Sequence, residues 1–161
     1  MLKFWIHILV FSVIIIKSAF GQVKEKVVTL PEIRVKATTE VNQRLYDAFR
    51  KSFPEADNLA WYKYDKEYLA KFIIKDMSHN ALYRQKGMMV YDISYGYENN
   101  MPADTKDLVN RNYDNYKIIR AINVKASGRN IWIVKLEGMK KYLTVRIEDQ
   151  EIDEVESYIK A

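Results

Sequence analysis

The feature that most constrains the fold is the stretch 53–61, where a helical pattern stops and a β pattern begins. The residue before a proline is pushed out of the helical region, so Phe53 before Pro54 predicts a helix end. Upstream, small and apolar side chains recur with the spacing of one helix face; they are Val41, Leu45, Ala48, Phe49 and Ser52. We therefore predict a helix over 38–52, begun by a threonine cap and packed on a sheet.

Strands follow this helix in quick succession. Trp61 lies in the first strand, and Asp65-Lys66-Glu67 forms the first hairpin tip. Apolar side chains then alternate at Tyr68, Ala70, Phe72 and Ile74, the pattern of a half-buried strand. The next predicted elements are a turn over 76–80, a third strand over 81–86, a bend at Gly87 and a fourth strand over 88–95. Such short links predict an antiparallel meander with one face under the helix and one toward water.

A looser copy of this order follows about sixty residues later. Pro102 is tolerated in the first turn of a second helix, which we expect to end at 113–115. Four further strands are predicted, beginning near Tyr116 and ending near Ile159. The sequence thus predicts an α+β fold of two tandem helix-plus-four-strand antiparallel repeats, with the helices on one face of the sheet. The repeats span 38–98 and 99–161 and form one compact unit.

The first residues have a separate role. Lys3, an apolar run and the small residues Ala19 and Gly21 before Gln22 predict a secretory signal peptide over 1–21. The alternative is a retained membrane anchor, but the apolar run is shorter than the roughly 20 residues that a spanning helix needs. Residues 22–37 form a polar lead-in arm, in which a short β-like piece is either an edge strand or a loose segment.

Composition narrows the classes of partner. The chain contains no cysteine, which excludes a disulfide framework and thiolate chemistry. Residues 22–147 carry 23 basic and 15 acidic side chains, whereas 148–156 carry six acids and no base. A basic domain can bind nucleic acid, anionic lipid or an acidic protein. We expect no nucleic acid, because the chain is exported and lacks a clustered Arg/Lys tract. Membrane contact is expected only if the signal is not cleaved.

No catalytic constellation is evident. His79 is the one histidine after the signal, and we expect it in a turn, where Ser78 beside it cannot complete a catalytic triad. The acidic stretch lacks calcium-loop spacing, and no glycine-rich phosphate loop occurs. The sequence predicts neither metal nor cofactor, and no enzyme activity.

The pattern formed by Phe53, Pro54, Ala56 and Trp61 resembles the PepSY-like family of exported bacterial proteins, also described as beta-lactamase-inhibitor-protein-like. The second helix and the strand after it resemble the family too, and together the similarity covers roughly 38–160. The resemblance implies tandem helix-plus-four-strand units, a periplasmic or secreted location, and binding rather than catalysis. The Asp-x-Asp-Gly turns common in the family are absent here, since the corresponding turns are 76–80 and 86–87.

The aromatic residues suggest where a ligand binds. The strands cannot bury all of the tyrosines on one face, and tyrosine and arginine are enriched at protein interfaces. The residues predicted to point away from the helices are Tyr62, Tyr64, Lys71, Lys75, Tyr142 and Arg146. We predict a non-catalytic module that binds an envelope protein or peptide there. The alternatives are an inhibitor or accessory subunit of an envelope hydrolase, a membrane-surface protein, and an amphipathic surface without a ligand. The sequence does not indicate an oligomeric state.

Overall fold

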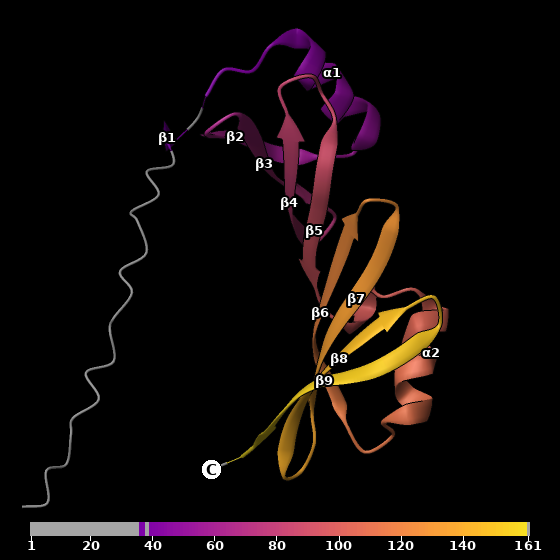
Figure 1. Cartoon of the computed structure of the whole chain (residues 1–161). Helices are drawn as coiled ribbons and strands as arrows, with labels where there is room; N and C mark the ends of the chain where they lie inside the picture. The colour runs from indigo at the N-terminus through magenta and orange to yellow at the C-terminus, as the bar shows by residue number, and fades with distance from the viewer. Residues whose placement is uncertain (1–35, 38, 161) are drawn as a thin grey trace, which may run out of the picture. The chain divides into compact units, whose positions relative to one another are not determined.

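The computed structural model describes residues 36–37 and 39–160. The predicted signal peptide and nearly all of the lead-in arm lie outside these residues. The described chain forms one antiparallel sheet and two α-helices (Figure 1). The first elements are β1 (Lys36–Ala37), α1 (Gln43–Ser52), β2 (Asp57–Tyr64), β3 (Glu67–Ile74), β4 (Met77–Arg84) and β5 (Met89–Gly96). The others are the 3-10 helix η1 (Glu98–Asn100), α2 (Ala103–Asn112), β6 (Lys117–Ala126), β7 (Arg129–Glu137), β8 (Lys141–Glu148) and β9 (Glu151–Ile159).

Helix α1 begins later than the sequence predicts. Its N-cap is Asn42, whose side-chain oxygen accepts a hydrogen bond from the Leu45 amide at 2.9 Å. A threonine cap at 38 or 39 is therefore wrong, and the Thr39 amide instead donates to the Trp61 carbonyl in the sheet. The predicted end is confirmed, because Phe53 is the C-cap.

Helix α2 ends with the same local geometry as α1. Its C-cap Tyr113 has φ −138° and ψ 53°, against −134° and 69° at Phe53. At each end the cap amide donates to the residue four positions earlier, and the cap carbonyl accepts from the residue three positions later. Pro102 is the N-cap of α2 rather than a residue of its first turn. The same C-cap geometry therefore connects each helix to the strand that follows it.

The strand order in the sheet is β1 to β9 in sequence, so each strand pairs with its neighbours along the chain. Residues opposite each other in an antiparallel pair share a face. One row crosses the sheet in this way; it is Phe72, His79, Ser94, Asn123, Trp132 and Ile147. Phe72 belongs to the core with α1, and Trp132 and Ile147 to the core with α2. This face is therefore the helix-covered face, and the other is the open face. The α+β class predicted from the sequence is confirmed.

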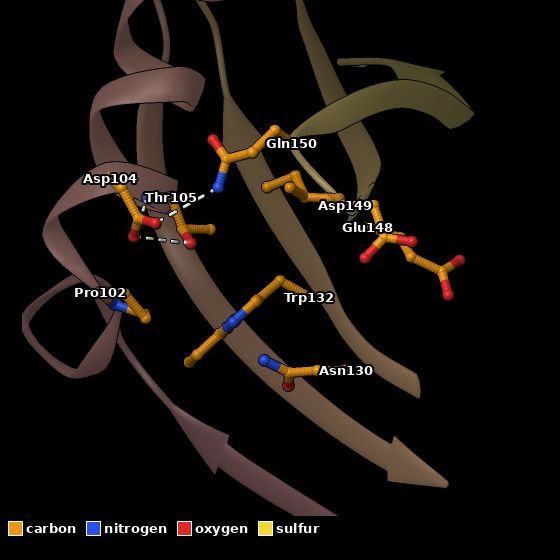
Figure 2. A pocket seen from close by; sticks show the side chains of 9 residues that line it. Pro102, Asp104, Thr105, Asn130, Trp132, Glu148, Asp149 and Gln150 are labelled. Atoms are coloured by element: carbon orange, nitrogen blue, oxygen red, sulfur yellow. Dashed lines mark hydrogen bonds between the residues drawn. The ribbon is translucent and has the colours of Figure 1, made fainter. Parts of the chain in front are cut away.

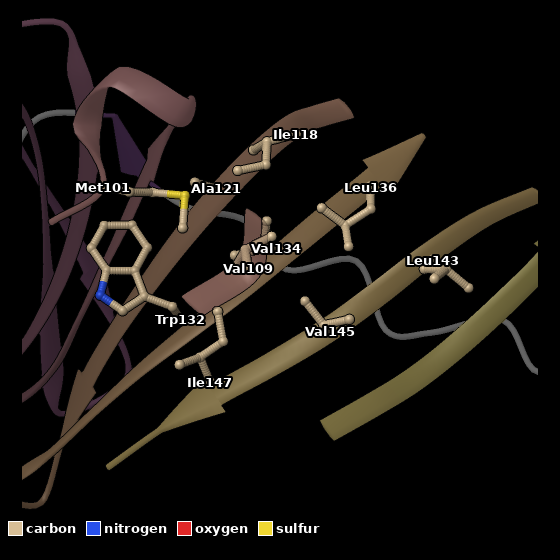
Figure 3. Packing of buried hydrophobic residues seen from close by; sticks show 10 residues of the cluster. All are labelled: Met101, Val109, Ile118, Ala121, Trp132, Val134, Leu136, Leu143, Val145 and Ile147. Carbon is tan, nitrogen blue, oxygen red and sulfur yellow. The ribbon is translucent and has the colours of Figure 1, made fainter. Parts of the chain in front are cut away.

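Two separate hydrophobic cores lie on the helix-covered face. The first joins α1 to β2, β3 and β4 and consists of Leu45, Phe49, Ala56, Trp61, Ala70, Phe72, Ala81 and Tyr83. The second joins α2 to β6, β7 and β8, and Figure 3 shows its ten side chains. They are Met101, Val109, Ile118, Ala121, Trp132, Val134, Leu136, Leu143, Val145 and Ile147. Strand β5 contributes no side chain to either core.

The middle of the sheet departs most from the sequence prediction. The predicted turn at 76–80 is wrong, because β4 begins at Met77 and the turn is only Lys75-Asp76. Lys75 has a left-handed φ of 56°, which allows this tight reversal. The sequence pattern of β5 predicts Met89, Tyr91, Ile93 and Tyr95 on one side of the strand. Met89 departs from this, because a register shift pairs it with Tyr83 of the first core, whereas Tyr91, Ile93 and Tyr95 keep the alternation. These residues lie on the open face, and polar residues take the helix-covered positions.

Candidate functional site

The open face has an apolar centre. It consists of residues from three cross-strand rows that run between β3 and β7. These residues are Leu69, Leu82, Tyr91, Ile93, Tyr95, Ile122, Val124, Ile131 and Ile133. All nine are half-buried rather than buried. No helix of the described chain packs on them in either core. We call this set the open-face centre. Sequence reasoning saw the alternation in β5 but did not assign these residues as candidates.

The predicted residues of the first half lie at one side of this centre. Tyr62 of β2 is half-buried, and the Lys71 ammonium nitrogen lies 5.2 Å from the centroid of its ring, a cation–π distance. Tyr64 is 47% exposed at the strand end. By register Tyr62 shares a row with Leu69, and Lys71 shares a row with Ile93 through Asn80. Tyr62 and Lys71 therefore lie on the open face in rows that contain residues of the open-face centre.

The predicted residues of the second half lie in β8, on the opposite side of the centre. Arg146 continues the row of Tyr95 and Ile133, and donates to Asp153 at 2.9 Å. Tyr142 is 38% exposed, and the Lys160 ammonium nitrogen lies 4.7 Å from its ring centroid. Thr144 between them shares their face but is buried. The structure does not bring the two predicted groups together; it places them across the apolar centre from each other.

Lys75 is the exception among the six predicted residues. It lies in the β3–β4 turn and lines a hollow on the helix-covered side together with His79 and Ser94. The prediction that it points away from the helices is therefore wrong. The cause is the early start of β4, which puts position 75 in a turn and ends the alternation of β3 at Ile74.

The prediction for His79 is wrong as well. It is a β4 residue, 8% exposed, stacked on Phe72 with ring centroids 4.9 Å apart. Its Nδ1 lies 3.1 Å from Oδ1 and 3.2 Å from Oδ2 of Asp92, which is 2% exposed. Because both carboxylate oxygens accept, the Nδ1 proton points at Asp92. Burying a carboxylate without such a partner would cost free energy. The hydrogen-bonded pair therefore explains why both His79 and Asp92 are tolerated at buried positions.

This pair does not extend to a hydrolase triad. Ser94 is the cross-strand partner of His79 on the same face. Among the described residues, however, the Ser94 hydroxyl makes no hydrogen bond to the imidazole. A nucleophilic serine needs its base within hydrogen-bond reach. Residues 36–37 and 39–160 also hold no group of three His, Cys, Asp or Glu side chains that could bind a metal ion.

Trp132 lines two hollows. One, of about 220 Å³, lies at the start of α2 (Figure 2), where the Gln150 side chain donates to Asp104 Oδ2 at 3.2 Å. The other, of about 380 Å³, contains His79, Ser94, Asn123 and Trp132 in its lining. We call the second one the polar groove. Sequence patterns missed it, because its floor comes from four strands that only the sheet register brings together.

Comparison with known proteins supports the fold. No family model matches the chain, and no curated protein matches its sequence. A solved structure of a BLIP-like protein from Bacteroides fragilis is similar, with a TM-score of 0.56 and 14% identity over 75% of this chain and 87% of that one. A DUF2874 family protein from Bacteroides ovatus gives 0.54 and 15%, over 72% and 89%. A proposed periplasmic protein from Bacteroides eggerthii gives 0.52 and 12%, over 75% and 90%.

At these identities the likeness shows a shared fold. The predicted resemblance to beta-lactamase-inhibitor-protein-like folds is confirmed at that level. The part of the chain that the structure describes contains no helix long and apolar enough to cross a membrane.

Proposed function

We propose that this chain is an exported binding protein whose open sheet face recognises a protein or peptide ligand. The observation that carries the proposal is the open-face centre, a patch of nine half-exposed apolar residues that neither core covers. Contiguous apolar surfaces of this kind, rimmed by polar side chains, mark interaction sites on soluble proteins. Here the rim carries Lys71 and Tyr62 on one side and Arg146 and Tyr142 on the other. The arrangement matches an interface with an apolar centre and an aromatic, charged border.

The rest of the proposal concerns location and ancestry. We infer that residues 1–21 are removed on export and that the ligand is met in the periplasm or outside the cell, in keeping with the proposed location of a structural neighbour. We also infer that α1–β5 and α2–β9 are structural repeats, because helix and four strands follow in the same order twice. Binding without catalysis is part of the same proposal, since the described residues hold a histidine–carboxylate pair but no aligned nucleophile.

The test is capture of envelope proteins by the purified mature chain, with matched variants. Ile93→Ser changes the open-face centre, whereas Ser94→Ala changes the next residue of β5 on the other face. Truncation of a central contact costs more than about 1 kcal/mol at an interface, which weakens binding severalfold. We expect Ile93→Ser to lose the captured partner and Ser94→Ala to keep it. A triple variant tests the border of the patch; it combines Tyr62→Ala, Tyr64→Ala and Tyr142→Ala. Unchanged capture of the partner by this variant would show that the border tyrosines do not take part in binding.

A second candidate is an inhibitor or accessory subunit of an envelope hydrolase, favoured by the BLIP-like neighbour. It predicts a one-to-one complex in which the captured partner is an enzyme whose turnover falls as the chain is added. A membrane-surface role is the third candidate, and it requires the N-terminal segment to remain. N-terminal sequencing of the exported protein decides this point, because cleavage as predicted leaves Gln22 first.

A further inference from the structure

The helix-covered face has a polar strip between its two cores. On this face β5 presents Asp92 and Ser94, and β6 presents Asn123. These side chains are 2%, 3% and 4% exposed, although no core side chain comes from β5. Buried polar groups are normally hydrogen-bonded, so each of them needs a partner. Asp92 has His79, whereas Ser94 and Asn123, which line the polar groove, have spare hydrogen-bonding capacity.

The hydrogen-bonding capacity of the groove can be counted. Asn123 donates its amide hydrogens to Asn130 Oδ1 at 2.7 Å and to the Ile131 carbonyl at 3.2 Å, so its own oxygen stays free to accept. His79 uses Nδ1 for Asp92, which leaves Nε2. Neither the Ser94 hydroxyl nor the Trp132 indole N–H bonds to any described residue. Both side chains line the groove, and neither polar atom is among the fully buried, unpartnered atoms of the described chain.

The rim of the groove is electrically balanced. Lys75 and Lys125 supply two positive charges, and Glu55 and Asp76 supply two negative charges. Asp76 accepts from Asn99 at 3.0 Å and from Asn100 at 2.6 Å, and these bonds lower the pKa of its carboxyl. The Asp92 carboxylate faces His79 Nδ1 and does not line the groove. A strongly anionic or cationic ligand therefore finds as much repulsion as attraction here.

The size and wall of the groove complete the description. Its volume of about 380 Å³ lies within the range of small-molecule sites, roughly 300–1,000 Å³. Trp132, Ile74 and Met77 give it apolar walls next to the polar floor. A purely apolar ligand would bury the serine, asparagine and histidine groups without partners, which costs free energy for each. A ligand with several hydroxyl groups satisfies all of them, since a hydroxyl both donates and accepts.

We propose that the polar groove binds a neutral polyhydroxylated molecule about the size of one sugar ring. Hydroxyl groups of the ligand bond Ser94, Asn123 Oδ1 and His79 Nε2, while its carbon–hydrogen face packs on Trp132. Asp92 positions the His79 ring and does not itself line the groove. The proposal does not rest on the open-face function, because the groove is on the opposite face of the sheet.

The experiment is an NMR titration of the uniformly labelled mature protein with D-glucose and with N-acetyl-D-glucosamine, and with L-lysine and acetate as charged controls. We expect saturable shifts of the His79 ring and of amides in β4, β5 and β6 for at least one sugar, with a Kd of about 1 mM for a ligand of this size. The charged controls should shift these signals weakly and without saturation. Signals of Tyr64 and Tyr142 on the open face should not move.

Two serine variants make the assignment specific. Ser94→Ala removes one hydroxyl from the floor and should weaken sugar binding by about 3- to 10-fold, the effect of one lost hydrogen bond. Ser78→Ala removes an exposed hydroxyl from the open face of β4 and should leave the Kd unchanged. Equal Kd values for wild type and Ser94→Ala, or no saturable shift with either sugar, would overturn the proposal. Preferential binding of lysine or acetate would overturn its neutral character.

Discussion

The two halves of the sheet use the same order of elements and pack it differently. In the first half, Phe49 of α1 contacts four aromatic rings; its ring centroid lies 4.9 to 6.3 Å from those of Phe72, Trp61, Phe53 and Tyr83. In the second half, Val109 of α2 takes the equivalent place over aliphatic residues. In the first half Trp61 pairs with Ala70, and at the equivalent place in the second half Ala121 pairs with Val134. A large aromatic side chain beside a small one is thus replaced by a medium aliphatic side chain beside a small one.

This difference shows that the layout does not depend on one packing solution. Aromatic packing has a cost in the first half, where the Trp61 indole nitrogen and the Tyr83 hydroxyl are buried without a hydrogen-bond partner. The second core consists mainly of Val, Leu and Ile side chains, which have no polar atom to satisfy. The first half should therefore depend more on single residues, and the second half should spread its stability over many.

The largest expected effect comes from the centre of each core. Phe49→Ala should lower the free energy of unfolding by about 3–5 kcal/mol, the usual range for a buried phenylalanine. Val109→Ala removes two methyl groups at the equivalent place and should cost about 2 kcal/mol. Urea unfolding followed by tryptophan fluorescence measures both. Equal losses of unfolding free energy would show that neither core depends more than the other on its central side chain, which would contradict the difference described above.

Two glycines with left-handed backbone give a smaller contrast. Gly87 (φ 85°) lies in the β4–β5 turn, where an added Cβ would lie 3.0 Å from Cβ of Ala48 in α1. Gly128 (φ 80°) lies in the β6–β7 turn with nothing within 4 Å. Gly128→Ala should lower the free energy of unfolding by about 1 kcal/mol, because alanine is disfavoured in the left-handed backbone conformation. Gly87→Ala should cost roughly 1 kcal/mol more because α1 must shift. The difference between the two urea midpoints tests whether α1 is held tightly against this turn.

Tyr83→Phe should raise the stability of the first half. The change removes a buried hydroxyl that makes no hydrogen bond of good geometry; its polar neighbour Ser52 already donates to the Ala48 carbonyl at 3.0 Å. We expect a gain of about 1 kcal/mol in unfolding free energy. Tyr113→Phe in the second half is the matched control, since Tyr113 is only partly buried, and it should have little effect. A loss of stability in Tyr83→Phe would indicate that the hydroxyl has a partner after all.

The same tyrosine predicts a dependence on alkaline pH. Burial raises the pKa of Tyr83 from 10.0 to about 12, because the phenolate is disfavoured inside the core. The folded protein therefore holds this proton more tightly than the unfolded chain. Its contribution is complete below pH 10 and is lost as the pH rises toward 12. Wild type should lose stability faster than Tyr83→Phe over this interval, as measured by urea midpoints at a series of pH values.

The smallest effect is expected at the surface of the second half. Arg129 donates to both oxygens of Glu148 at 2.6 Å, which lowers the pKa of that carboxyl. The contribution of Glu148 is present above its unfolded pKa and is lost as the pH falls through its lowered folded value. Because the Arg129 side chain is 55% exposed and water screens the pair, Arg129→Met should change the urea midpoint only slightly, and less at high salt. A large change would mean that the sheet edge near β9 depends on this pair.

The sequence predicts helices and strands well where apolar side chains occupy one face of the element and polar side chains the other. The end of α1 at Phe53 and the alternation in β3 are confirmed, because proline geometry and strand periodicity act locally. The sequence Ser78-His79-Asn80 predicts a turn at His79, because three polar residues in a row resemble a loop. His79 is in fact a buried strand residue made tolerable by Asp92, thirteen positions away.

The candidate sites show the same limit. Tyr62, Lys71 and Arg146 could be predicted on the open face, because their alternation with apolar neighbours is local. The polar groove could not, because Ser94, Asn123 and Trp132 become neighbours only through pairing across three strands. A polar residue at a buried position looks like a surface residue until its partner is known.

The strictly sequential order of the strands has a consequence for how this chain folds. Every strand pairs with the one made just before it, so no pairing has to wait for a distant part of the sequence. Chains rich in such local contacts fold faster than those that must close long loops. Residues 43–84 contain α1 and the three strands it covers, and they emerge before any of the second half. The aromatic core of the first half can therefore form while the second half is still being synthesised.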